Sequence, residues 1–198
     1  MSRVGVFGGT FDPVHHGHLI IAQEAVTRLK LDRLLFVPAN RPSHKRAPGL
    51  ALVGHRVAML RLATRGSRHF AVSRIEADRG GVSFTVQTLE ILGKDPRVEL
   101  FFLMGQDSLE DFAQWRDPAR IVELARLVVV PRGDRDVPPL PPSFRRRVMY
   151  VKPPRIGISS TEIRRRLKRG LPVRFWTPDA VLNYVYRHGL YGSGRQRA

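Results

Sequence analysis

The sequence predicts an α/β fold with helices on both faces of a doubly wound parallel sheet. Short apolar runs rich in β-branched residues alternate with segments whose apolar residues recur at helical spacing. A glycine-rich loop separates the first run from the first helical segment, and strand–helix–strand units of this kind place successive strands in parallel. The length of 198 residues suits a single core. We therefore expect one domain over residues 1–190 with about five parallel strands.

The first strand–helix–strand unit lies at the amino end of the chain. Val4–Phe7 is an apolar run that ends at two glycines, as a buried strand does before a tight loop. A helical apolar pattern then begins at Leu19 and has run out by Asp32. Leu34–Val37 repeats the strand pattern and stops at a proline. The unit predicts a Rossmann-like sheet, which binds ligands at the carboxyl ends of its strands.

The same alternation continues through the rest of the chain. Further strands are expected at His69–Ser73, Val98–Met104 and Leu127–Val130, and helices at Val53–Thr64, Thr85–Leu92 and Pro118–Ala125. Small helices close the domain at Ser160–Arg169 and Pro178–His188, the second with Thr177 as its cap. The proline-rich stretch 133–142 is expected to be a surface loop, and residues 191–198 a flexible basic tail.

Composition restricts the chemistry and the partners. The chain has no cysteine, which excludes disulfides and thiolate catalysis. It has no apolar run long enough to span a membrane and no signal peptide, so we expect a cytoplasmic protein without a membrane partner. The net charge of +17 implies an anionic partner. A basic surface, a nucleic-acid groove and a cleft for small phosphorylated substrates all fit this charge, but no nucleic-acid-binding signature is present.

The loop after the first strand, GGTFDPVHHGH over residues 8–18, is placed to bind phosphate. It connects a strand to a helix N-terminus, where backbone N–H groups and the helix dipole favour anions. It is neither a dinucleotide-binding G-x-G-x-x-G nor a Walker loop. A zinc site at the histidines would need a further ligand that no nearby motif supplies.

This loop resembles the H-x-G-H region of the nucleotidylyltransferase superfamily, in the form found in bacterial nicotinate-mononucleotide adenylyltransferases. The resemblance implies that His15 and His18 contact the phosphates of ATP, with His16 at the variable position. It also implies ATP contacts for the start of the loop, at Gly8, Gly9, Thr10 and Phe11.

A second motif, ISSTEIR, opens the helix expected at residue 160. It resembles the family's I-S-S/x-T-x-I-R motif, which implies catalytic charge stabilisation by Arg164. The same motif implies ATP binding by Ile158, Ser159, Ser160 and Thr161. Ser159 and Glu162 also have the spacing of a capping box, so we expect Glu162 to cap the helix.

Three further segments match the pattern of these enzymes. Gly105-Gln106-Asp107 and Trp115 fit G-x-D-x(7)-W, and Ser83-Phe84-Thr85 fits S-[YF]-T. The resemblance implies ATP binding by Gly105 and Asp107, and binding of the pyridine nucleotide by Thr85, Trp115 and Arg116. The loop PANRPSHK resembles P-x-x-x-P-P-H-K, with Ser43 in place of the second proline, and implies substrate contacts from His44 and Lys45.

The resemblance implies transfer of the AMP part of ATP to nicotinate mononucleotide, with Mg²⁺ bound mainly by the ATP phosphates. No metal site built from protein side chains is predicted. Two alternatives stay open: a sister adenylyltransferase acting on phosphopantetheine or nicotinamide mononucleotide, and a basic nucleic-acid-binding domain. A homo-oligomer is compatible with the sequence, which does not fix the oligomeric state.

Overall fold

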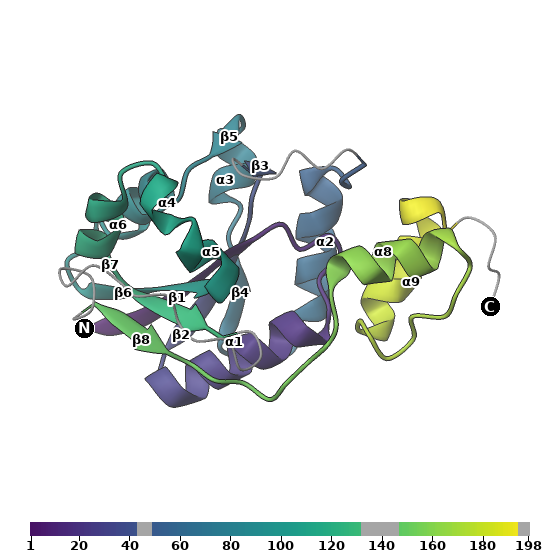
Figure 1. The fold of residues 1–198 in the computed structure, drawn as a ribbon, viewed down its shortest axis with the longest axis horizontal. Helices are drawn as coiled ribbons and strands as arrows, with labels where there is room; N and C mark the ends of the chain where they lie inside the picture. Colours follow the sequence, from purple (N-terminus) through teal and green to yellow (C-terminus); the bar gives the residue numbers. More distant parts are fainter. Residues whose placement is uncertain (43–48, 132–146, 194–198) are drawn as a thin grey trace.

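The computed structural model describes residues 1–42, 49–131 and 147–193. A parallel sheet dominates them, with strand order β4-β2-β1-β6-β7-β8 (Figure 1). Its strands are β1 (Ser2–Gly9), β2 (Arg33–Pro38), β4 (Phe70–Val72), β6 (Val98–Gly105), β7 (Ala125–Val130) and β8 (Val148–Tyr150). The short strands β3 (Arg41–Pro42) and β5 (Val82–Ser83) pair separately.

The helices are α1 (His16–Leu29), α2 (Val53–Ala63), α3 (Ile75–Arg79), α4 (Thr85–Leu92), α5 (Gln106–Glu110), α6 (Pro118–Leu124), α8 (Ser160–Lys168) and α9 (Asp179–Arg187). Two 3₁₀ helices, η1 (Phe112–Gln114) and η2 (Leu190–Gly192), accompany them. No helix within the described ranges is long and apolar enough to cross a membrane.

Numbered along the chain, the strands of the main sheet lie in the order 3-2-1-4-5-6, which is that of the doubly wound dinucleotide-binding fold. The α/β prediction is confirmed, but the described part of the chain has six strands in this sheet and not about five. The additional strand is β8, whose Val148 pairs with Leu127 of β7. It has three residues between a basic run and a proline pair, which is too short for a recognisable strand pattern.

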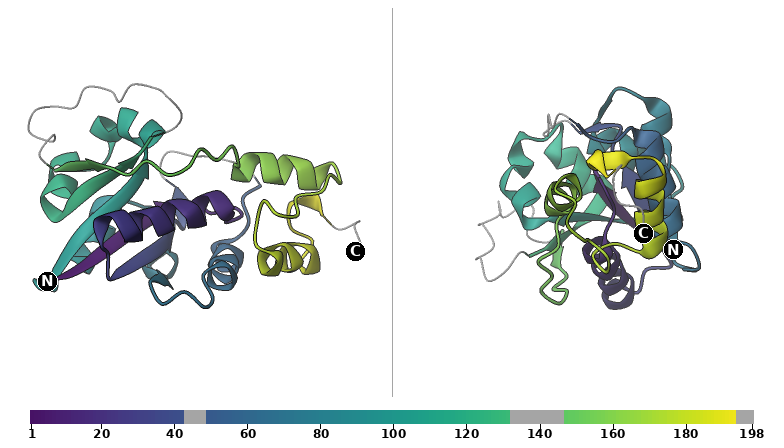
Figure 2. Two further views of the ribbon diagram at one scale, coloured as in Figure 1. Left: turned by 90° about the horizontal axis from the view of Figure 1, so that it is seen from below. Right: turned by 90° about the vertical axis from the view of Figure 1, so that its right-hand side faces the viewer.

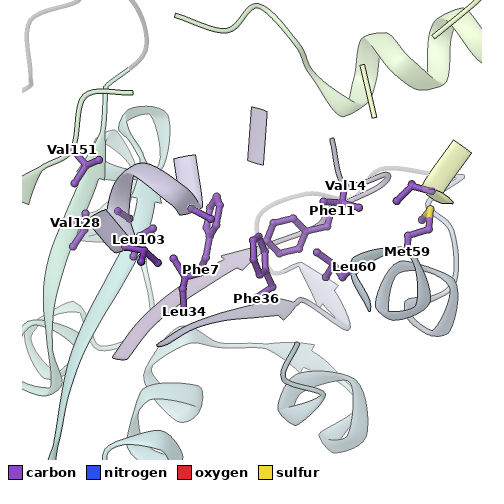
Figure 3. Packing of buried hydrophobic residues seen from close by; sticks show 14 of the residues in the cluster. Phe7, Phe11, Val14, Leu34, Phe36, Met59, Leu60, Leu103, Val128 and Val151 are labelled. Carbon is purple, nitrogen blue, oxygen red and sulfur yellow. The ribbon is translucent and has the colours of Figure 1, made fainter. Parts of the chain in front are cut away.

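The sheet buries an apolar cluster on each face because its strand residues alternate in direction. Phe7, Leu103 and Val128 join the cluster under α1 and α2 (Figure 3), whereas Val6 and Phe102 join the cluster under α4 and α6. The first cluster also includes residues of α8 and α9. Figures 1 and 2 show these two helices together at the end of the molecule farthest from the N-terminus.

Most predicted boundaries agree with the structure to within a few residues, and α4 has the predicted bounds. Two details differ at the carboxyl end. Thr177 was expected to cap α9, but Pro178 is the N-cap and the Thr177 hydroxyl donates to the carbonyl of Val14, 2.8 Å away. The folded part also continues beyond residue 190 to a buried Ser193. The predicted loop 133–142 and the rest of the tail lie outside the described residues.

Candidate active site

The candidate site lies where the strand order reverses, between the carboxyl ends of β1 and β6. β1 ends at Gly9, and β6 ends at Gly105, the N-cap residue of α5. We call residues 8–18, which connect β1 to α1, the phosphate loop. The helix α1 begins at His16, so both motif histidines sit at the N-terminal end of a helix. This position suits an anionic ligand.

The two motif histidines form one stacked unit. The rings of His15 and His18 have centroids 3.7 Å apart and an interplanar angle of 28°. The backbone N–H of His15, the N-cap residue, donates to Nδ1 of His18 over 3.2 Å. Because Nδ1 accepts this bond, the proton of the neutral His18 ring is on Nε2. Nε2–H is the donor type that a phosphate oxygen needs.

Close packing determines where these rings lie. Phe11 contacts His18 edge to face at 5.0 Å, and its side chain is buried in the core next to Phe7 and Phe36. Of the predicted ATP contacts, Phe11 therefore has its ring turned into the core. A Cβ at Gly17 would lie 3.0 Å from two atoms of the His15 ring. The glycine of H-x-G-H thus provides the space that the first histidine occupies.

The second motif docks onto the phosphate loop. The Ser160 hydroxyl donates to the carbonyl of Pro13 over 2.9 Å, and Arg164 donates to the carbonyl of Asp12 over 2.7 Å. Arg164 also donates to the hydroxyl of Thr161 over 3.4 Å. The structure therefore brings the N-terminal ends of α1 and α8 to one place, although the two motifs are far apart in sequence.

Only half of the predicted capping box forms at α8. The Ser159 hydroxyl accepts from the backbone N–H of Glu162 over 3.2 Å, as an N-cap does. The Glu162 carboxylate was expected to return to the N-cap backbone, but it pairs with the Arg165 guanidinium at 2.7 Å. The hydrogen bonds to this guanidinium are charge-assisted, which favours them over a backbone contact, and they lower the pKa of Glu162.

The predicted pyridine-binding residues gather beyond β6. The guanidinium of Arg116 lies 4.8 Å from the ring centre of Phe84, which directly precedes Thr85. Trp115 is half-buried against Phe102 and Phe112, at 6.0 and 5.6 Å between ring centroids. The S-F-T triplet and the tryptophan segment are thus neighbours, as the resemblance implies.

The carboxylate predicted to bind ATP lies on the β6 side of the switch point. Asp107 is exposed in the first turn of α5, two residues after the glycine that ends β6. Gly105 faces open space, because a Cβ built there would meet no atom within 4 Å. Both residues therefore face away from the packed core.

Comparison with known proteins assigns the chain to a family. Residues 6–166 match the cytidylyltransferase-like family model. A Thermomicrobium roseum protein named "Probable nicotinate-nucleotide adenylyltransferase" is 45% identical over 96% of this chain and 92% of its own length. A Thermus thermophilus protein of the same name is 47% identical over 96% of this chain and 99% of its own length. The chain belongs to the nicotinate-nucleotide adenylyltransferase family.

The fold of this nicotinate-nucleotide adenylyltransferase family member has solved counterparts. Plasmodium falciparum nicotinic acid mononucleotide adenylyltransferase complexed with NaAD superposes with a TM-score of 0.79. The two chains are 18% identical, and the match covers 97% of this chain and 98% of the other. At this identity the likeness shows a common fold.

In this family member the start of the P-x-x-x-P-x-H-K loop is tied to the S-F-T triplet. The backbone N–H of Asn40 donates to the Ser83 hydroxyl and its side-chain amide donates to the carbonyl of Gly81, each over 2.9 Å. His44 and Lys45 lie outside the described residues, so their substrate contacts stay predictions. The described start of the loop lies beside Ser83 of the S-F-T triplet.

Sequence reasoning did not single out Arg56, which connects the segments around this site by hydrogen bonds. Its side chain is 2% exposed and donates to four backbone carbonyls, those of Thr10, Ala39, Asn40 and Ala51. Burial lowers its pKa while the charge of Asp12 raises it, and an arginine stays charged at neutral pH. A signal was present, because Arg56 lies four residues before Leu60 on the buried face of α2.

Asp12 and Tyr191 also contribute without having been assigned a role. Asp12 is part of the phosphate loop, and its side chain is 1% exposed. The Tyr191 hydroxyl donates to Oδ1 of Asp12 over 2.6 Å. No local pattern could have paired them, since they are 179 residues apart.

Two carboxylates, Asp12 and Asp107, follow the strands β1 and β6 at the switch point. The described residues contain no group of three histidine, cysteine or acidic side chains that could hold an ion. The Asp12 carboxylate is engaged by Tyr191 and the N–H of Ala51. Asp107 is an exposed carboxylate beside the switch point. Mg²⁺ on phosphates needs few protein ligands, because it keeps several waters.

Proposed function

We propose that the protein transfers the AMP part of ATP to the phosphate of nicotinate mononucleotide, giving nicotinate adenine dinucleotide and pyrophosphate in NAD biosynthesis. The observation that carries the proposal is the docking of α8 on the phosphate loop through Ser160 and Arg164, in a chain of this family. This contact gathers two imidazoles, one guanidinium and two helix N-terminal ends at the switch point of the sheet. Such a set of donors suits a polyphosphate.

The reaction needs no covalent enzyme intermediate. An oxygen of the mononucleotide phosphate forms a bond to the α-phosphorus of ATP, while the bond from that phosphorus to the β-phosphate oxygen breaks and pyrophosphate leaves. The attacking phosphate monoester is ionised at neutral pH and needs no general base. The protein therefore has to align the two nucleotides and stabilise charge on the phosphate oxygens.

His18 and Arg164 have the contacts that this role requires. The hydrogen bond from the backbone N–H of His15 to Nδ1 of His18 places the ring proton of His18 on Nε2. From there it can be donated to a phosphate oxygen. Arg164 is fixed by the carbonyl of Asp12, and the rest of its half-buried guanidinium remains for the phosphates. His15, stacked on His18, supplies a second ring. Gly8, Gly9, Thr10, Gly105 and Asp107, together with residues 158–161, would complete the ATP end.

The acceptor end is proposed at the other side of β6. Trp115 would stack on the pyridine ring, and Thr85 and Arg116 would contact its carboxylate. Substrate contacts from His44 and Lys45, which lie outside the described residues, are part of the proposal through the resemblance alone. The cation–π contact between Arg116 and Phe84 supports this placement, because it sets the two segments side by side. Mg²⁺, held chiefly by the phosphates of ATP, would supply additional neutralisation of phosphate charge.

His18→Ala tests the proposal. Loss of one well-placed donor lowers turnover by about 10² to 10³. Product formation from ATP, Mg²⁺ and nicotinate mononucleotide, followed by chromatography, should fall by that factor while the circular dichroism spectrum stays that of the wild type. His69→Ala is the matched control, because this histidine contacts the carbonyl of Asp32, outside the site. Wild-type turnover by the His18 variant would overturn the proposed role.

A further inference from the structure

The C-terminal end of the described chain contacts the phosphate loop through one hydroxyl. Tyr191, in η2, donates to Oδ1 of Asp12 over 2.6 Å. The pair connects the last described turn, η2, with the middle of the phosphate loop. Asp12 is fully enclosed, so its negative charge depends on the few groups around it.

Those groups include the proposed catalytic arginine. The backbone N–H of Ala51 also donates to Oδ1 of Asp12, over 3.3 Å. On the other side, Oδ2 lies 3.9 Å from a guanidinium nitrogen of Arg164. The same nitrogen donates to the Asp12 carbonyl over 2.7 Å. The Asp12 carboxylate therefore accepts from the Tyr191 hydroxyl and a backbone N–H at Oδ1, and it attracts the guanidinium of Arg164 at Oδ2 from a greater distance. The charge of the buried Arg56 also acts on it.

The backbone and surroundings of Tyr191 fit it for this contact. Its φ of +59° lies in the left-handed region, which costs a non-glycine residue about 1 kcal/mol and needs support from packing. That support comes from the core cluster of α8 and α9, against which Tyr191 packs. Burial first, and then the charge of Asp12, raise the pKa of Tyr191. The hydroxyl accordingly keeps its proton as a donor throughout the neutral range.

We propose that Tyr191 is a positioning residue, which occupies Asp12 and thereby leaves the Arg164 guanidinium to bind phosphate. The inference rests on the proposed function. Without the hydroxyl, the buried carboxylate loses its closest donor and draws the guanidinium of Arg164 toward Oδ2. An arginine paired in this way binds a polyphosphate more weakly, because the carboxylate neutralises part of its positive charge. The turn η2 thus controls phosphate binding by Arg164, although η2 itself does not line the site.

Tyr191→Phe removes this hydroxyl and keeps the ring. Tyr184→Phe is the matched control, because that hydroxyl contacts Nδ1 of His55 over 2.9 Å and connects α9 to α2 away from the phosphate loop. We expect kcat for adenylyl transfer to fall about 10-fold in the Tyr191 variant, with KM for nicotinate mononucleotide unchanged. The Tyr184 variant should keep the wild-type kcat. Thermal unfolding of both variants gives the temperature range in which each is fully folded.

An Arg164→Lys background separates positioning from a general structural effect. If Tyr191 acts through the guanidinium, Tyr191→Phe lowers kcat no further once that guanidinium is gone. Multiplying effects would overturn the inference, as would equal kcat values for the two tyrosine variants in an enzyme that makes the dinucleotide. Absence of dinucleotide formation by the wild-type protein would overturn the proposed function, and this inference with it.

Discussion

Gly17→Ala should separate activity from stability. A Cβ at Gly17 would lie 3.0 Å from Cε1 and Nδ1 of His15 and 3.5 Å from a methyl group of Ile156. The first two contacts are tighter than ordinary van der Waals packing, so the His15 ring must move by a few tenths of an ångström. That ring is stacked on His18 at 3.7 Å, and His18 in turn contacts Phe11 with 5.0 Å between ring centroids.

Two opposing effects determine how Gly17→Ala changes the stability of the protein. Alanine is more favourable than glycine inside a helix by roughly 0.5 to 1 kcal/mol, and Gly17 lies within α1 without a positive φ. The strain at His15 offsets this gain, so the melting temperature should stay within a few degrees of the wild type. A displaced phosphate donor costs less than a deleted one, and we expect kcat/KM for ATP to fall between about 10-fold and 10²-fold.

Gly54→Ala provides the matched control. Gly54 is the second residue of α2, as Gly17 is of α1, and a Cβ there would meet no atom within 4 Å. Steady-state kinetics and thermal unfolding of both variants should show lost activity at position 17 alone, with a small rise in stability at position 54. Wild-type kcat/KM for Gly17→Ala would refute the argument that this glycine exists to accommodate His15.

Three further changes address separate parts of the account. Trp115→Ala should raise KM for nicotinate mononucleotide more than it lowers kcat, because stacking serves binding; an unchanged KM would refute the stacking role. Arg56→Met should lower the free energy of unfolding in urea by about 3 kcal/mol or more, since four carbonyls lose their donor; a loss below about 1 kcal/mol would contradict this. Ser160→Ala should cost about 1 kcal/mol in the same assay through the lost bond to Pro13; no change would show that the contact does not anchor α8.

Patterns that are local in sequence predicted most of the fold. The helix at Thr85–Leu92 has the expected bounds because its apolar spacing is regular and a glycine follows it. The strands β1, β2, β6 and β7 are apolar runs that are buried as parallel strands are. Arg164 contacts the loop that carries the motif histidines, because a doubly wound sheet places loops from distant segments at one edge.

The parts that were missed depend on long-range contacts. β8 forms because its three residues pair with the edge of β7, and the segment itself has no distinctive sequence pattern. Arg56 is buried where four carbonyls, from the phosphate loop and from the segment between β2 and α2, converge on it. Tyr191 was assigned to the tail over residues 191–198, yet it packs against the core and donates to Asp12. None of these contacts can be read from spacing.

The proposed function depends most on which molecule accepts the AMP part of ATP. Pyrophosphate release can be measured from ATP and Mg²⁺ with nicotinate mononucleotide, nicotinamide mononucleotide or phosphopantetheine in parallel. We expect nicotinate mononucleotide to give the highest kcat/KM, with nicotinate adenine dinucleotide as the product. Faster release with phosphopantetheine, or no release with any of the three acceptors, would contradict the account.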